Sequence, residues 1–185
     1  LAQRGDMVHG EPGDPAETAV AWKVAMEQRD RPAFLSLTRQ GVPSLERDGP
    51  LGADGLRKGA YVLAEASGGN PEAMILASGS EVHLAVEARK VLEEEGIPTR
   101  VVSMPSWSLF REQSQDYQDQ VLPADVPLRV SVEAGTTLGW ERWVGPGGVS
   151  VGVDKFGNSA PWQVLFEKYR ITPERVAQAV RDLRR

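Results

Sequence analysis

Few side chains in this 185-residue sequence have the chemistry of a catalytic group. Cysteine is absent, which excludes a thiol nucleophile, a disulfide scaffold and a zinc–thiolate site. The two histidines are His9 and His83. His83 and Glu87 lie one helical turn apart, a spacing that can hold a metal ion, but no third ligand follows nearby and we interpret the pair as a solvated helix face. We interpret His9 as structural.

Loops that bind nucleotides are also missing. The sequence contains neither G-x-G-x-x-G nor G-x-x-x-x-G-K-[ST], the glycine-rich patterns that cradle phosphates at the start of a helix. Ser78, Ser80 and Ser103 could belong to a Ser-His-Asp arrangement, but none stands in the G-x-S-x-G elbow that exposes a nucleophilic serine. The sequence therefore predicts neither a nucleotide-dependent enzyme nor a serine hydrolase.

Arg39 is the strongest candidate for ligand binding. The run from Ala33 to Thr38 is short, apolar and bounded by breakers, which predicts a buried strand that ends at Arg39 and Gln40. Ligands of open α/β sheets bind at the carboxyl ends of the strands, and a guanidinium fork can grip a phosphate there. From position alone a surface ion pair is the commoner role of such an arginine, so both interpretations stay open.

The segments before and after this arginine can be assigned from their end signals. Asp14 and Pro15 open a helix that runs to about Gln28, with Glu17 completing a capping-box arrangement. The proline- and glycine-rich stretch 42–60 predicts a connection between domains, and we place a boundary near residue 49. Further strands are predicted at 61–64, 73–77, 100–104, 128–132 and 149–153, and further helices begin near 78, 159–161 and 172–173.

Residues 73–104 form a strand-helix-strand unit, which predicts two parallel strands joined by a right-handed crossover. Ser78, together with Glu81, is predicted to cap the helix of this unit. Two buried helical stripes are predicted, Leu84, Ala88, Val91 and Leu92 in this helix and Val176, Val180 and Leu183 in the last one. We therefore predict an α/β fold with an open, mostly parallel twisted sheet and helices on both faces.

Composition excludes several kinds of partner. Lys and Arg number 21 against 26 Asp and Glu, which gives a net charge of -5 and argues against nucleic acid or an anionic membrane surface. The five tryptophans are spread along the chain, which favours core and interface roles over base stacking. No apolar run approaches the roughly 20 residues of a membrane span, and the start has no signal-peptide pattern. We expect a cytoplasmic protein, and the first residue, Leu1, suggests a fragment or a processed chain.

Several strings in this sequence, taken together and in order, resemble the C-terminal part of transketolases. They are PGDPAETAVAW, LTRQGVPSL, KGAYVLAEA, ASGSEVHLAVEARKVLEEEGIPTRVVSMPSW, SVEAG, and DKFGNSAP followed by TPERVAQAV. The series T-R-Q with Pro43, then G-S-E-V, S-M-P-S, V-E-A-G and F-G-x-S-A-P makes the resemblance specific. The opening segment departs from the family pattern, because Glu11 stands where the family usually has an arginine.

The resemblance implies a reaction and a division of the chain. Transketolases transfer a two-carbon ketol unit between sugar phosphates of the pentose phosphate pathway, as homodimers with thiamine diphosphate and a divalent metal such as magnesium. Residues 1–48 resemble a remnant of the pyrimidine-binding domain, and residues 49–185 resemble the transketolase C-terminal domain. In the family, the arginine of T-R-Q helps to hold the substrate phosphate, so the resemblance assigns Arg39 to substrate-phosphate binding.

The resemblance also implies which residues this segment lacks. The G-D-G motif with its asparagine, the glutamate that activates the thiamine ring and the T-H-Q-P string lie upstream of residue 1 in transketolases, so no catalytic, cofactor-binding or metal-binding residue is assigned to this segment. The segment is expected to be inactive alone and to need the upstream domains and a second protomer. Three alternatives stay open: a stand-alone or split-subunit interaction module, a free-standing sugar-phosphate binder, and the equivalent domain of deoxyxylulose-phosphate synthase or the pyruvate dehydrogenase beta chain.

Overall fold

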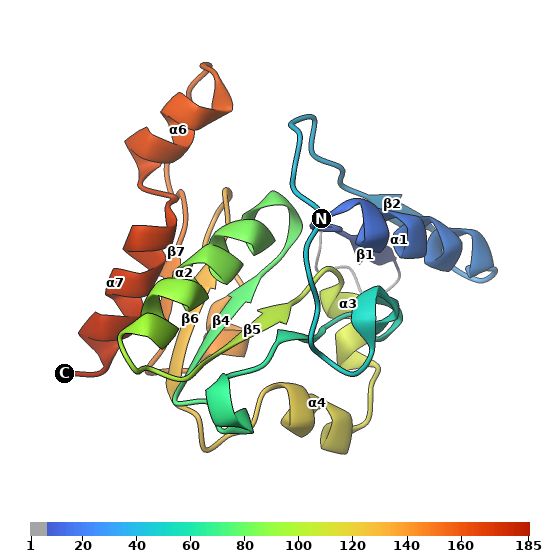
Figure 1. The fold of residues 1–185 in the computed structure, drawn as a ribbon. Helices are drawn as coiled ribbons and strands as arrows, with labels where there is room; N and C mark the ends of the chain where they lie inside the picture. Colours follow the sequence, from blue (N-terminus) through green and yellow to red (C-terminus); the bar gives the residue numbers. More distant parts are fainter. Residues whose placement is uncertain (1–6) are drawn as a thin grey trace.

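The computed structural model describes residues 7–185 and places a five-stranded sheet beside a small two-stranded one (Figure 1). The small sheet pairs β1 and β2 in parallel. The large sheet has the order β3-β5-β4-β6-β7, in which β3 runs antiparallel to β5 and the other pairs are parallel. The strands are β1 (Val8–Gly10), β2 (Ala33–Leu35), β3 (Tyr61–Ala64), β4 (Ala73–Ala77), β5 (Thr99–Ser103), β6 (Leu128–Val132) and β7 (Val149–Val151).

Helices cover both faces of the large sheet. The α-helices are α1 (Pro15–Glu27), α2 (Val82–Glu94), α3 (Trp107–Arg111), α4 (Gln115–Val121), α5 (Glu141–Val144), α6 (Trp162–Tyr169) and α7 (Pro173–Leu183). Short 3-10 turns lie at η1 (Gly52–Lys58), η2 (Ser67–Gly69) and η3 (Gly79–Glu81). Helices α2 and α7 pack on one face, and α3 to α5 contribute to the core of the other. The predicted α/β fold with a mostly parallel sheet is confirmed, as is the parallel pairing of β4 with β5.

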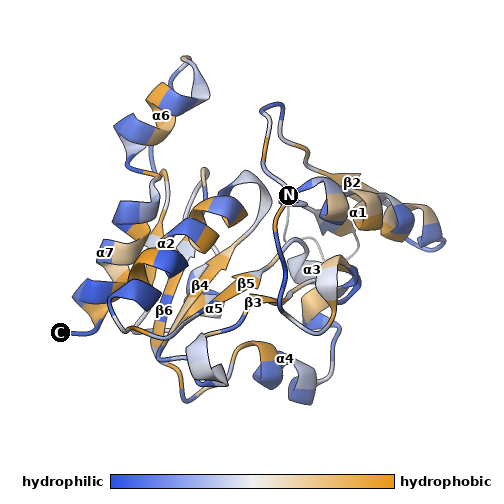
Figure 2. Cartoon of the chain, in the orientation of Figure 1, coloured by the Kyte–Doolittle hydropathy of each residue, from blue (hydrophilic) through white to orange (hydrophobic). Residues whose placement is uncertain are grey.

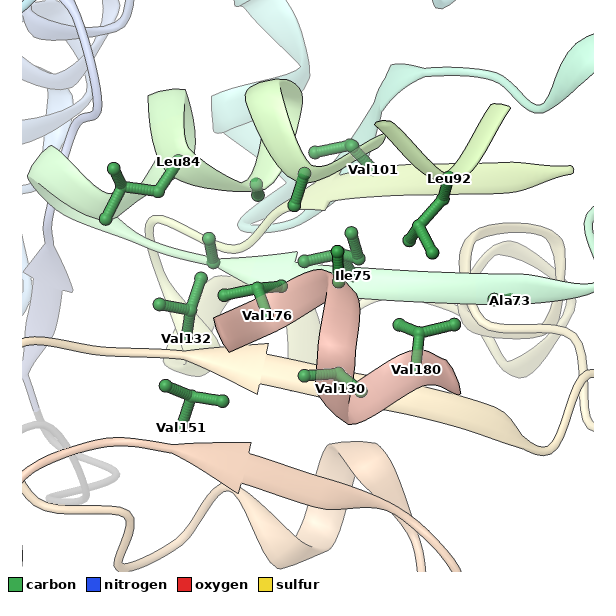
Figure 3. Packing of buried hydrophobic residues seen from close by; sticks show 14 of the residues in the cluster. Ala73, Ile75, Leu84, Leu92, Val101, Val130, Val132, Val151, Val176 and Val180 are labelled. Atoms are coloured by element: carbon green, nitrogen blue, oxygen red, sulfur yellow. The ribbon is translucent and has the colours of Figure 1, made fainter. Parts of the chain in front are cut away.

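The central strand β4 shows why this sheet is the core of the fold. Ala73, Ile75 and Ala77 pack into the cluster under α2 and α7, whereas Met74 and Leu76 pack into the cluster on the opposite face. All five side chains are inaccessible to solvent, as the continuous apolar run of a strand covered on both faces requires. In Figure 3, Ile75 lies among side chains of the neighbouring strands and of α7.

The predicted helical stripes are largely confirmed. Val176 and Val180 of α7 are fully buried, and the outward face of that helix is hydrophilic (Figure 2). In α2 the side chains of Leu84, Ala88 and Leu92 are buried, but Val91 is 37% exposed, so its assignment to the buried stripe was wrong. The stripe centres on Ala85 and Ala88, and Val91 lies at its edge. None of the helices among residues 7–185 is both long enough and apolar enough to cross a bilayer.

The predicted buried strand at 33–38 is the main correction to the fold. Strand β2 ends at Leu35, and the side chain of Phe34 is 44% exposed. The small sheet has two strands among the described residues, and Ala33 and Leu35 pack against the apolar cluster that includes α1, so the face of β2 that carries Phe34 has no covering layer. Arg39 therefore follows β2 at a distance of four residues instead of ending the strand.

Two smaller boundaries also differ from the predictions. Strand β5 lies one residue earlier than predicted, and β7 ends at Val151 instead of Val153. Ser78 does not cap α2, because the turn η3 intervenes and the serine hydroxyl points to carboxylates that follow other strands. The stretch 36–51 contains neither a helix nor a strand, and the domain boundary that we predict near residue 49 falls within it.

Candidate functional site

Arg39 lies in the irregular segment between β2 and η1 and is exposed. None of the ion pairs among residues 7–185 involves its guanidinium. Its neighbour Gln40 donates a backbone N–H to the Thr38 hydroxyl at 3.3 Å, which turns the chain at this point. The surface ion pair that we left open for Arg39 is therefore not formed within the described residues, and the charge of the guanidinium stays available.

A buried polar network ties this segment to helix α1 and to the large sheet. Asp14, the N-cap of α1, accepts two hydrogen bonds from the guanidinium of Arg47, at 2.7 and 3.0 Å. The Arg47 Nε donates to the Tyr61 hydroxyl at 2.9 Å, and that hydroxyl donates to the Glu17 carboxylate at 2.6 Å. Ser103, at the end of β5, donates to the same Glu17 oxygen at 2.7 Å. The network therefore joins α1, the irregular segment, β3 and β5.

Burial and pairing shift the titration of this network. Burial alone would raise the pKa of Asp14, but the hydrogen bonds from Arg47 and from backbone N–H groups outweigh it and hold the pKa below its usual value. Burial and the negative charge of Glu17 raise the pKa of Tyr61, which keeps its hydroxyl protonated as a donor. Glu17 also accepts the Gly13 N–H at 2.7 Å. The predicted capping box therefore forms with the N–H of the residue before the N-cap instead of the N–H of Asp14.

A second cluster gathers carboxylates at the carboxyl ends of three strands. Glu11 follows β1, Ser78 follows β4 and Glu133 follows β6. The Ser78 hydroxyl lies 2.9 Å from the Glu11 carboxylate and 3.1 Å from that of Glu133. The buried Glu81 accepts the backbone N–H of Ala134 at 3.2 Å nearby. Three carboxylates thus face one another, and no Lys or Arg side chain of the described residues pairs with them; the His9 ring lies 3.4 Å from the Glu11 carboxylate.

Burial favours the protonated form of two of these carboxyl groups, Glu81 and Glu133. Burial, followed by the charges of Glu81 and Glu11, raises the pKa of Glu133 to about 8. Burial also raises the pKa of Glu81. For His9 burial disfavours the charged form and lowers the pKa, although the neighbouring Glu11 opposes that shift. Near neutral pH the cluster therefore holds a proton that can be donated or shared.

A cavity of about 430 Å³ opens over this cluster. Its walls combine His9, Glu11 and Glu133 with the indole rings of Trp107 and Trp140. The rings of Trp107 and Trp140 meet edge to face with centroids 4.9 Å apart, which fixes one wall. Carboxylates beside aromatic rings can accept hydrogen bonds from hydroxyl or amino groups. Nevertheless, the His, Asp and Glu side chains of residues 7–185 include no group of three placed to hold a metal ion.

The other residues that the sequence singled out are scattered. His83 lies half-exposed on α2 and Glu87 is exposed, as expected for a solvated helix face. His9 is buried in β1 and stacks on Phe34 with ring centroids 5.3 Å apart. Of the tryptophans, Trp140 and Trp143 are in the core, whereas Trp22 and Trp162 are exposed. Within the described residues, none of these side chains forms a hydrogen bond or ion pair with the Arg39 side chain.

Both polar clusters were missed as clusters by sequence reasoning. Asp14 and Glu17 were identified only as helix-end signals, and no pattern pointed to Arg47. The resemblance motifs G-S-E-V and V-E-A-G contain Glu81 and Glu133, which is the signal that could have paired them.

Comparison with known proteins decides the family. Residues 59–172 match the family model described as the transketolase-like TK C-terminal domain, which is more than half of the chain. The chain belongs to the transketolase family. It is 46% identical over 172 residues to the transketolase of Geobacillus stearothermophilus, an alignment that covers 93% of this chain and 26% of that protein.

Solved transketolases have the same fold. The transketolase from Leishmania mexicana matches 96% of this chain and 25% of its own with a TM-score of 0.87 and 41% identity. A transketolase from Pichia stipitis, solved in complex with sedoheptulose-7-phosphate, matches 97% of this chain and 26% of its own with a TM-score of 0.84 and 37% identity. This chain corresponds to the C-terminal part of transketolases and spans about a quarter of the length of these relatives. These matches favour a transketolase domain over the alternatives left open above, the equivalent domain of deoxyxylulose-phosphate synthase or of the pyruvate dehydrogenase beta chain.

Proposed function

We propose that the complete protein to which these residues belong transfers a two-carbon ketol unit between sugar phosphates. The observation that carries the proposal is the match of 93% of this chain to a transketolase at 46% identity. The complex of the Pichia stipitis transketolase with sedoheptulose-7-phosphate supports a sugar phosphate as the substrate class. The reaction would place the protein in the pentose phosphate pathway, in the cytoplasm.

Thiamine diphosphate and a divalent metal such as magnesium are part of this proposal through the family alone. Thiamine diphosphate supplies the carbanion chemistry of ketol transfer when it is bound. Among residues 7–185, no group of three His, Asp or Glu side chains is placed to hold a metal ion. We therefore place the cofactor site outside the described residues and derive no step through it. Residues 7–185 would contribute a residue that binds the substrate phosphate and the C-terminal domain that packs with the domains holding the cofactor.

The partners follow from the same reasoning. We propose that residues 1–48 complete a pyrimidine-binding domain with upstream residues, and that residues 49–185 form the C-terminal domain of a homodimeric enzyme. The exposed apolar side chains of the first part, Trp22, Met26 and Phe34, support this division, because a half-exposed parallel sheet needs further layers. No nucleic acid or membrane partner is proposed. A free-standing sugar-phosphate binder, the alternative left open above, would have to bind its ligand without these further layers of structure.

Arg39 is our candidate for binding the substrate phosphate. Its exposed, permanently charged guanidinium has no partner among the described residues and can form two parallel hydrogen bonds to a phosphate. A hydrogen bond to a charged group contributes about 1.5–3 kcal/mol, which corresponds to roughly a 10- to 150-fold change in affinity.

Arg39→Ala in the complete protein is therefore expected to raise KM for a phosphorylated acceptor aldose by about 10- to 100-fold. KM for an unphosphorylated aldose should stay unchanged, since that substrate offers no anion. Steady-state kinetics with the two acceptors checks both expectations. Arg29→Ala, which removes another exposed arginine, is the matched control. An unchanged KM for the phosphorylated acceptor would remove Arg39 from the site.

A further inference from the structure

The segment 36–48 carries Arg39 and has no helix or strand of its own. At its start the Ser36 N–H donates to the Gly10 carbonyl at 2.9 Å, and at its end the Asp48 N–H donates to the Leu63 carbonyl at 3.2 Å. Between these ends, within the described residues, the hydrogen bonds to the rest of the molecule come from Leu45 and Arg47. The course of the segment therefore depends on those two residues and on the apolar contact of Leu45 with the core.

Asp14 and Arg47 hold Leu45 through both of its backbone polar groups. The Leu45 N–H donates to the Asp14 carboxylate at 3.0 Å, and the Leu45 carbonyl accepts from Arg47 Nη1 at 2.8 Å. The same guanidinium binds both oxygens of Asp14. A planar fork fits this closed arrangement, since it can address a carboxylate, a carbonyl and the Tyr61 hydroxyl from fixed directions. We call the arrangement of Asp14, Leu45 and Arg47 the clasp.

The clasp is rigid because it is buried and paired. The side chain of Asp14 is fully buried and that of Arg47 is 9% exposed, so neither ion can exchange its partner for water without a loss of stability. Tyr61 and Glu17 extend the clasp to β3 and to the first turn of α1. Arg47 contributes the positive charge of this network, against the two carboxylates of Asp14 and Glu17.

We propose that Arg47 is a positioning residue for Arg39. By holding Leu45 against Asp14 it fixes the course of segment 36–48 and so the place at which the Arg39 guanidinium is presented to a sugar phosphate. Arg47 is buried and acts through Arg39, without touching the substrate. The inference rests on the role proposed above for Arg39.

Arg47→Lys in the complete protein tests this inference. Lysine keeps the charge that neutralises Asp14 but lacks the fork that also reaches Leu45 and Tyr61. KM for a phosphorylated acceptor should rise by about 3- to 10-fold, while kcat and the KM for an unphosphorylated aldose stay at their wild-type values. Exchange of the Leu45 amide hydrogen should accelerate by about tenfold or more, with the amides of β4 unchanged.

Arg129→Lys is the matched control. Arg129 is half-buried and, like Arg47, donates to backbone carbonyls, here those of Val126 and Trp143, but it lies on β6 away from segment 36–48. Arg129→Lys should leave unchanged the ratio of the KM for the phosphorylated acceptor to the KM for the unphosphorylated one. If Arg47→Lys does not fold, Asp14→Asn, which can still cap α1, tests the same clasp from the other side.

The outcomes separate this inference from the proposed function. A wild-type KM ratio in folded Arg47→Lys, alongside a changed ratio in Arg39→Ala, would overturn the positioning role and leave the phosphate role standing. A wild-type ratio in both variants would overturn both. Equal changes for the two acceptors would show a general structural role for Arg47 and would also overturn the inference.

Discussion

Asp14→Ala is expected to lower the free energy of unfolding by about 4–6 kcal/mol. The substitution removes the N-cap of α1, whose carboxylate accepts the Glu17 N–H at 2.8 Å. It also leaves the buried guanidinium of Arg47 without its bidentate partner, and a broken buried pair typically costs about 3–5 kcal/mol. The cap itself contributes about 1 kcal/mol. Urea unfolding followed by circular dichroism measures the difference.

Thr172→Ala measures the loss of an N-cap alone and so separates it from the loss of the buried pair between Asp14 and Arg47. Thr172 caps α7 by accepting the Arg175 N–H at 3.2 Å and, like Asp14, is followed by a proline, but it pairs with no buried charge among the described residues. Its loss should cost about 1 kcal/mol. If Asp14→Ala costs no more than Thr172→Ala, the pair with Arg47 does not stabilise the fold.

Glu133→Gln is expected to make the protein more stable than wild type at alkaline pH, with a stability difference that grows by on the order of 3 kcal/mol between pH 6 and pH 9. The carboxyl of Glu133 is buried beside Glu11 and Glu81, which raises its pKa to about 8 from an ordinary value of 4.5. A raised carboxyl pKa means that the contribution of Glu133 to stability is complete below about pH 4.5 and is lost as the pH rises through about 8. Glutamine keeps the shape and cannot ionise.

The stability difference between Glu133→Gln and wild type should therefore grow between pH 6 and pH 9. Urea unfolding at both values measures it. Glu11→Gln removes one of the neighbouring charges and should give a smaller effect of the same sign. Glu87→Gln, which removes a charge from an exposed position on α2, is the control. A difference that does not change with pH would mean that Glu133 is not protonated in the folded protein.

The elements of the large sheet could be predicted because local signals and tertiary packing agree there. Ala73–Ala77 and Leu128–Val132 are apolar runs with breakers at both ends, and each became a strand with the predicted bounds. The prediction of a buried strand at 33–38 failed because only one face of β2, that of Ala33 and Leu35, is covered among the described residues, so Phe34 on the other face stays half-exposed. Burial there depends on contacts that a local pattern does not contain.

The polar clusters could not be predicted from spacing. Arg47 and Asp14 are 33 residues apart, and Arg47 lies in a stretch without periodicity, so nothing local marks it as buried. Ser78 and Glu133 are 55 residues apart and meet because β4 and β6 are neighbours in the sheet. Arg39 was found from its apparent place at a strand end and from the T-R-Q motif, and its role stays a prediction. The domain boundary near residue 49 also stays a prediction.

The most direct test of the transketolase assignment is a ketol-transfer assay on the protein expressed from its own gene. The protein is saturated with thiamine diphosphate and magnesium, and product formation from a ketose phosphate and an aldose phosphate is followed. We expect transfer of a two-carbon unit that depends on both additions, from a polypeptide with a mass several times 20.1 kDa. A folded protein that binds thiamine diphosphate but forms no product would contradict the account.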